Sequence, residues 1–183
     1  MAAHGEETAD GAAWFGRPAA DLKPLTSEGA KEARDMIREA AAEGDAPRLK
    51  QLLDGKSPLA AFLAAAFDLS PFLRDAARRR PQWLEGLFDG DAPTRLTEIL
   101  GAIDAAGIEA ESEAAIMRAL RELKGEAHFL IALSSLAAAG DAPIAVRRLS
   151  DLADTCVRAA VSFLLLEAQR AGKLRLPDVA DPQ

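Results

Sequence analysis

The tetrapeptide Gly-Asp-Ala-Pro occurs three times, at residues 44–47, 90–93 and 140–143, and its copies divide the chain into segments. Each copy follows one helical pattern and precedes the next. Glycine can take the left-handed conformation that ends a helix, aspartate can cap the helix that follows, and proline fits the first helical turn. We therefore expect each copy to end one helix and to begin another.

An internal repeat is the alternative, because the copies are 46 and 50 residues apart, close to the period of helical solenoids. A degenerate solenoid would show three superposable units that begin at the three copies. The segments after the copies share only an arginine and some leucines: RLKQLLDGK (48–56), TRLTEILGA (94–102) and IAVRRLSDL (144–152). This weak similarity favours helix boundaries of a shared type over a true repeat.

The composition of the 183-residue chain favours helices and excludes several functional classes. Hydrophobic residues make up 49% of it and aromatic residues only 5%, with alanine and leucine dominant over β-branched residues. A net charge of −7 argues against non-specific binding to nucleic acid or to an anionic membrane. No apolar stretch approaches about 20 residues, no secretory signal is visible, and the single Cys156 excludes an internal disulfide. We expect a cytoplasmic protein.

Serine-proline pairs and the spacing of apolar residues predict a series of shorter helices. Ser57-Pro58 and Ser70-Pro71 each combine a capping residue with a proline in the first turn. A further turn carries Trp83, Leu84, Leu87 and Phe88. The expected helices cover residues 27–43, 47–53, 58–67, 71–79 and 92–106.

Two long helices, each roughly 40 Å long at 1.5 Å per residue, are expected on either side of residues 140–143. Apolar residues that step by three and four form a seam on each helix. The first seam is Ile116, Leu120, Leu123, Ala127 and Leu130; the second is Val146, Leu149, Ala153, Cys156, Ala160 and Phe163. Such seams favour close antiparallel packing. The expected fold is all-α, a helical bundle built on a long antiparallel αα-hairpin with shorter covering helices.

The expected organisation is a flexible N-terminal arm over residues 1–26, a helical domain over 27–172 and a tail over 173–183. We expect no catalytic, metal-binding or cofactor-binding residue, because no histidine and cysteine cluster has ligand spacing and no phosphate loop follows a strand. His128 and Cys156 lie beside or on the seams, where a structural role is the simplest interpretation. Arg78, Arg79 and Arg80 end a helix, where the helix dipole favours cations; a phosphate site is the alternative.

Arg118, Arg121 and Lys124 form the candidate docking surface of the chain, since they are spaced by three along the first long helix. They would face an acidic partner or a following domain. The alternative is a solvated helix face whose cations pair with Glu122 and Glu126.

Three stretches carry a resemblance to a known family. They are SPFLRDAARRRPQWLEGLF (70–88), AIMRALRELKGEAHFLIALSSLA (115–137) and LSDLADTCVRAAVSFLLLEAQRAGKLRLPDVADP (149–182). In this order they resemble the N-terminal helical region of the bifunctional glutamine synthetase adenylyltransferase and adenylyl-removing enzymes, of the alphaproteobacterial type. The resemblance covers residues 57–182.

The resemblance implies a role in the nitrogen-dependent regulation of glutamine synthetase by nucleotidyl transfer. Members of the family bind Mg and ATP or ADP in nucleotidyltransferase domains that carry an Asp-x-Asp motif, which follows the stretch resembling the tail at 173–183. No position here matches that motif, so the chain is expected to be inactive alone, as the helical portion of such an enzyme. The implied partners are a nucleotidyltransferase domain, glutamine synthetase and PII signal proteins.

A stand-alone helical module that binds other proteins without catalysis is the alternative function. Its mark would be an exposed apolar surface larger than the patches of a typical monomer.

Overall fold

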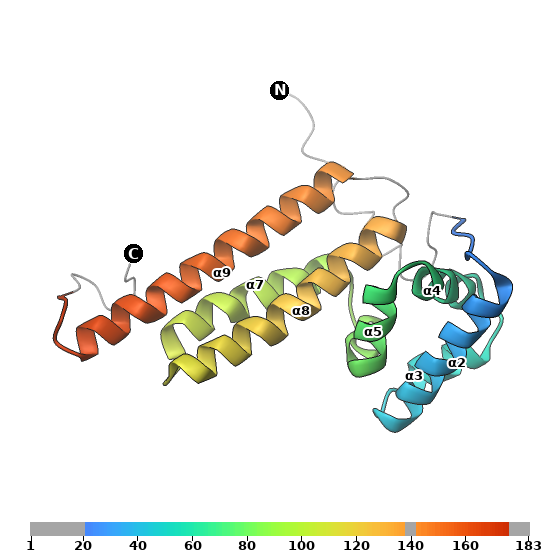
Figure 1. Cartoon of the computed structure of the whole chain (residues 1–183), viewed down its shortest axis with the longest axis horizontal. Helices are drawn as coiled ribbons and strands as arrows, with labels where there is room; N and C mark the ends of the chain where they lie inside the picture. The colour runs from blue at the N-terminus through green and yellow to red at the C-terminus, as the bar shows by residue number, and fades with distance from the viewer. Residues whose placement is uncertain (1–20, 138–141, 176–183) are drawn as a thin grey trace. The chain divides into compact units, whose positions relative to one another are not determined.

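The computed structural model describes residues 21–137 and 142–175, and in these residues it contains helices and no strand (Figure 1). The all-α prediction is therefore confirmed. The chain divides into two compact units. Among the described residues, unit 1 comprises 21–95, 129–137 and 142, and unit 2 comprises 96–128 and 143–175.

Unit 1 contains most of the short helices, at bounds close to those predicted. Ser57 and Ser70 act as the predicted caps: their hydroxyls accept the backbone N–H groups of Ala60 at 3.1 Å and of Leu73 at 3.3 Å. The helices are α2 (Ser27–Glu43), α3 (Pro47–Asp54), α4 (Pro58–Leu69), α5 (Pro71–Arg79) and α6 (Gln82–Glu85), followed by the 3₁₀ turn η1 (Gly86–Phe88).

The helix α4 is the centre of unit 1. Eight of its twelve residues are buried, including Phe62, Leu63 and Phe67. A helix that is apolar on nearly every side has to be surrounded by other helices. It packs against α2 and α5, and Trp83 and Phe129 bring two further segments together with ring centroids 5.7 Å apart.

The first Gly-Asp-Ala-Pro joint corrects a prediction. Gly44 has φ −94° and Asp45 has φ 53°, so the aspartate takes the left-handed position and does not cap α3. The bond from Ala46 N–H to the carbonyl of Ala41, 2.9 Å, closes a Schellman motif around Asp45. Gly44 is needed for a different reason, because a Cβ there would lie 2.6 Å from Cγ of Pro81.

At the second joint, the predicted aspartate cap and the proline in the first turn are both present. Asp91 accepts the N–H of Thr94 at 2.8 Å and caps α7 (Ala92–Glu109), with Pro93 in the first turn. At the third joint residues 140 and 141 lie outside the described residues, and α9 begins at Ala142. In the described residues, the segments after the joints hold α3 to η1, then α7 and α8, then α9. They are not three equivalent units, so the solenoid interpretation is wrong.

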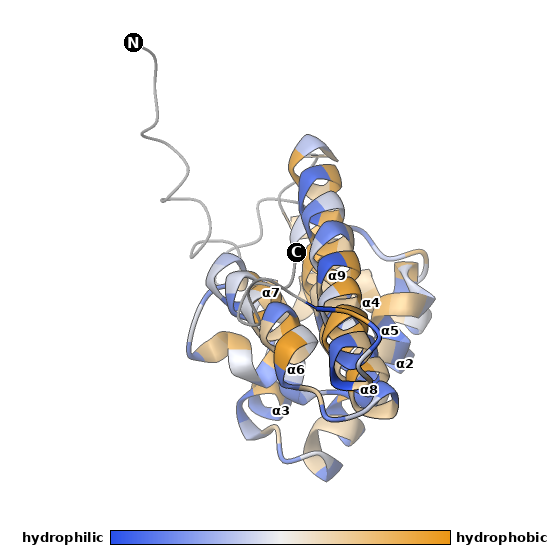
Figure 2. Cartoon of the chain, turned by 90° about the vertical axis from the view of Figure 1, so that its left-hand side faces the viewer, coloured by the Kyte–Doolittle hydropathy of each residue, from blue (hydrophilic) through white to orange (hydrophobic). Residues whose placement is uncertain are grey.

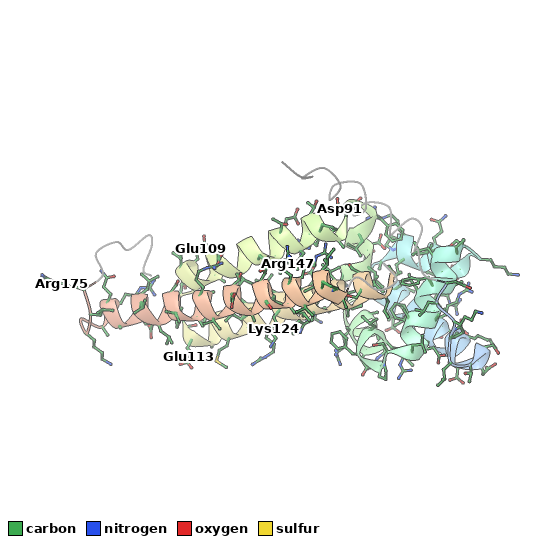
Figure 3. The ribbon with its side chains drawn as sticks, turned by 90° about the horizontal axis from the view of Figure 1, so that it is seen from above. Asp91, Glu109, Glu113, Lys124, Arg147 and Arg175 are labelled. Atoms are coloured by element: carbon green, nitrogen blue, oxygen red, sulfur yellow. The ribbon has the colours of Figure 1, made fainter. Side chains whose placement is uncertain are left out.

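Unit 2 is formed by parts of three helices that lie side by side: α7, α8 (Glu113–Ala137) and α9 (Ala142–Arg170) (Figure 3). Gly107 lets α7 approach α9 closely, because a Cβ there would lie 2.6 Å from the carbonyl oxygen of Ala159. Arg158 of α9 donates two hydrogen bonds, of 3.0 and 2.8 Å, to the carboxylate of Asp104 on α7. Small residues and one bidentate ion pair thus join these two helices.

The predicted seam on α9 is largely wrong. Val146 is 62% exposed, and Leu149 and Ala153 are also exposed. The buried stripe of α9 is displaced around the helix and consists of Leu152, Thr155, Ala159, Ser162, Phe163 and Leu166. The continuous hairpin remains a prediction, since residues 138–141 between the long helices lie outside the described residues. The domain bounds also remain predictions, and most of the expected arm (1–26) and tail (173–183) lies outside the described residues.

Candidate interaction surfaces

The predicted docking residues Arg118, Arg121 and Lys124 are all exposed on the part of α8 that belongs to unit 2. They do not form a straight stripe. A step of three residues turns the helix by about 300°, so each successive cation is displaced by about 60° around the axis. Arg118 and Lys124 consequently point in directions about 120° apart. Any docking role for the three residues remains a proposal.

Lys124 lies near two groups that the sequence placed beside the seams. Partial burial, and then the positive charge of Lys124, lowers the pKa of His128. Burial raises the pKa of the Cys156 thiol, although Lys124 acts in the opposite direction. Burial therefore favours a neutral imidazole and a neutral thiol, which fits the structural roles expected for both residues.

Arg78 and Arg79 line a shallow hollow of about 370 Å³ in unit 1. Glu39 and Glu43 of α2 line the same hollow, together with Met36, Ala40, Gly44, Pro81 and Gln82. These two carboxylates would repel an anion bound in the hollow. The hollow therefore gives no support to the phosphate site considered for these arginines.

An ion-pair cluster in unit 1 has a structural explanation. The guanidinium of Arg48 donates to Glu85 at 2.8 Å and to both oxygens of Asp89 at 2.6 Å, and it lies 5.2 Å from the ring centroid of Phe88. Glu85 also accepts the backbone N–H groups of Arg48 and Leu49, which are free donors in the first turn of α3. The cap that α3 lacks at Ala46 is thus supplied by a side chain from α6.

These contacts set the protonation of the cluster. Hydrogen bonds to Asp89 and Glu85 raise the pKa of Arg48. Burial acts to raise the pKa of Glu85, but the bonds from Arg48 and Leu49 outweigh it and the pKa lies below its ordinary value. The bond from Arg48 lowers the pKa of Asp89. The cluster holds one cation between two anions and is an anchor between α3 and α6.

The largest feature that the sequence interpretation missed is an exposed apolar face on α9. We call it the outer face and define it by Val146, Leu149, Ala153, Val157, Val161 and Leu164. Val157 is 63% exposed and Leu164 is 61% exposed. Figure 2 shows that α9 carries hydrophobic residues along its whole length, beside hydrophilic ones. The signal was present in the sequence, because valines at 146, 157 and 161 cannot all share a stripe with Leu152 and Phe163.

Among the described residues, no group of three or more histidine, cysteine, aspartate or glutamate side chains is placed to hold a metal ion. A search of the same residues finds no helix with both the length and the apolarity to span a membrane.

Comparison with protein-family models shows which family these helices belong to. The family model described as glutamate-ammonia ligase adenylyltransferase matches residues 60–181, about two thirds of the chain. The chain belongs to this family. The matched region begins within α4 and extends past the end of α9, so it includes most of the core helix of unit 1 and all of the outer face of α9.

Relatives within the glutamate-ammonia ligase adenylyltransferase family are much longer than this chain. The bifunctional glutamine synthetase adenylyltransferase/adenylyl-removing enzyme of Mesorhizobium japonicum is 50% identical over 92% of this chain, which spans 17% of that protein. The enzymes of the same name from Brucella suis and Xanthobacter autotrophicus are 40% and 37% identical, over 94% and 84% of this chain, which spans 18% and 16% of those proteins. No solved structure matches.

Proposed function

We propose that the chain is the helical portion of a glutamine synthetase adenylyltransferase and supports nucleotidyl transfer without performing the chemistry itself. The observation that carries the proposal is the family match over residues 60–181 in a chain that spans 17% of a relative at 50% identity. The relatives are named as enzymes that add and remove an adenylyl group. In this proposal the reacting groups belong to the rest of the longer polypeptide, together with Mg and the nucleotide.

The partners follow from the same proposal. A nucleotidyltransferase domain would contact the helical portion directly, and glutamine synthetase would be the protein whose activity is regulated. A PII signal protein is a further candidate partner. Arg118, Arg121 and Lys124 are exposed and could meet an acidic surface on any of these partners.

A stand-alone binding module is the second candidate, and the exposed outer face of α9 is the observation that favours it. Such a module would bind a separate protein through this face. The two proposals differ in the direct partner, because the first includes a nucleotidyltransferase domain of the same polypeptide and the second has only a separate protein.

The purified 183-residue chain is expected to transfer no AMP from ATP to glutamine synthetase and to remove none from the adenylylated enzyme, with or without magnesium. Incorporation of radiolabelled AMP into glutamine synthetase measures the first reaction, and its release measures the second. The Mesorhizobium relative is the positive control. Magnesium-dependent transfer by the purified chain would contradict the proposal.

A further inference from the structure

We infer that the outer face of α9 is the docking surface for an apolar helix that the longer polypeptides of this family supply from outside the region spanned by this chain. The inference rests on the proposed function, because it takes this chain as one portion of such a polypeptide. It names the surface and the chemistry of its partner, and it assigns the main contact to α9 in place of the cations of α8.

The outer face and the buried stripe lie on nearly opposite sides of one helix. At 3.6 residues per turn, Val146, Val157 and Leu164 point in directions within about 20° of one another. Thr155 and Ala159, which are buried, point more than about 130° away from them. A helix that is apolar on two opposite sides is typical of the interior of a larger helical assembly.

The centre of the outer face carries no charged residue. Between Val146 and Leu164 its sector of the helix contains only alanine, leucine, serine and valine. Arg147, Asp154 and Arg158 lie along one edge of it, with Asp154 only about 20° from Val161, and Arg158 is held by Asp104. A helix face of this length that is exposed to water ordinarily carries charged residues. We therefore expect the outer face to be covered by an apolar partner.

The spacing of the outer face indicates the geometry of the partner. Val146 and Val157 are eleven residues apart, and so are Ala153 and Leu164. Eleven residues make three turns with a drift of only about 20°, so the face runs nearly parallel to the helix axis. A second helix can then lie along it at a small crossing angle over about 27 Å, the length of 18 residue steps.

A tethered helix fits this surface better than a second copy of the chain. The face is one helix wide, so a contact between two such faces falls at the low end of stable interface sizes. Each copy carries a net charge of −7, which opposes self-association. A helix in the same polypeptide acts at millimolar effective concentration and needs much less area. The relatives are about six times as long as the matched region, so most of their chain lies outside it and is available to supply such a helix.

Thiol labelling tests the inference directly. Val157→Cys is introduced in a Cys156→Ser background, first in the 183-residue chain and then in the Mesorhizobium relative whose matching segment is replaced by this chain. The introduced thiol is expected to react with a maleimide at least about tenfold more slowly in the long protein, because a tethered helix covers the face most of the time. Gly101→Cys, at an exposed position of α7 with open space around it, is the matched control and is expected to change little.

Equal labelling rates at position 157 in the two proteins would overturn the inference. Sedimentation of the 183-residue chain gives an independent result: a monomer is expected, and a dimer that Val157→Asp abolishes would assign the face to a second copy and overturn it too. Neither readout requires activity. A long protein that is inactive but protected at position 157 would refute the proposed function and leave the docking surface standing.

Discussion

Replacing Gly107 with alanine is expected to destabilise unit 2 by about 1–3 kcal/mol, the range seen for overpacked helix contacts. The added Cβ would lie 2.6 Å from the carbonyl oxygen and 2.7 Å from the Cα of Ala159. Both atoms are backbone, so the strain can be relieved only if α7 and α9 move apart. The movement would also loosen the ion pair between Arg158 and Asp104. Urea unfolding followed by far-ultraviolet circular dichroism measures the loss.

The matched control lies on the same helix. Gly101 is exposed and a Cβ there would meet no atom within 4 Å, so Gly101→Ala should stabilise the protein by about 0.5–1 kcal/mol through helix propensity. Opposite signs for the two substitutions would show that the contact with Ala159, and not the glycine itself, decides the effect. Two stabilising substitutions would contradict the close approach of α7 and α9.

Replacing Glu85 with alanine is expected to destabilise unit 1 by about 1–3 kcal/mol, because it removes the side-chain cap of α3 and the charged hydrogen bond to Arg48. The carboxylate is 14% exposed and accepts three hydrogen bonds, from the side chain of Arg48 and from the N–H groups of Arg48 and Leu49. Its removal leaves the first turn of α3 uncapped. Asp89→Ala is the control: Asp89 also binds Arg48 but is 71% exposed, so a loss within about 1 kcal/mol is expected.

The pH dependence gives a second readout for Glu85. Its pKa is lower in the folded protein, so its stabilisation is fully present above the unfolded value of about 4.3 and is lost as the pH falls through the folded value. The difference in stability between the protein and Glu85→Ala should therefore shrink below about pH 4. A difference that stays constant into acid would show that packing, and not the ionised carboxylate, anchors α3.

Local chemistry allowed the helix boundaries to be predicted, because a cap and a proline act within one turn. Ser57 and Ser70 begin helices as expected, and α2 has the predicted bounds. The first Gly-Asp-Ala-Pro joint could not be predicted in the same way. The close approach of Pro81 requires a glycine at position 44, and the cap of α3 comes from Glu85. Both features therefore depend on residues about 40 positions away in the sequence.

The candidate surfaces were harder to predict than the fold. A seam search assumes that a helix has one apolar face, whereas α9 has two. The predicted seam mixed members of both, taking Val146 from the outer face and Phe163 from the buried stripe. The packing of Ala159 against Gly107 and the buried stripe of α9 show which side faces the neighbouring helix. The family resemblance supplied what the residues themselves did not, because no catalytic constellation points to adenylyl transfer.

The measurement that tests the central claim most directly is transfer of AMP to glutamine synthetase by three proteins: the intact Mesorhizobium relative, the same protein lacking the matching segment, and the same protein carrying this chain in its place. If the chain is a supporting helical portion, the exchanged protein should act within about tenfold of the intact one, a barrier change of about 1.4 kcal/mol. The protein without the segment should lose more. Full activity without the segment, or a folded exchanged protein as inactive as the deletion, would contradict the claim.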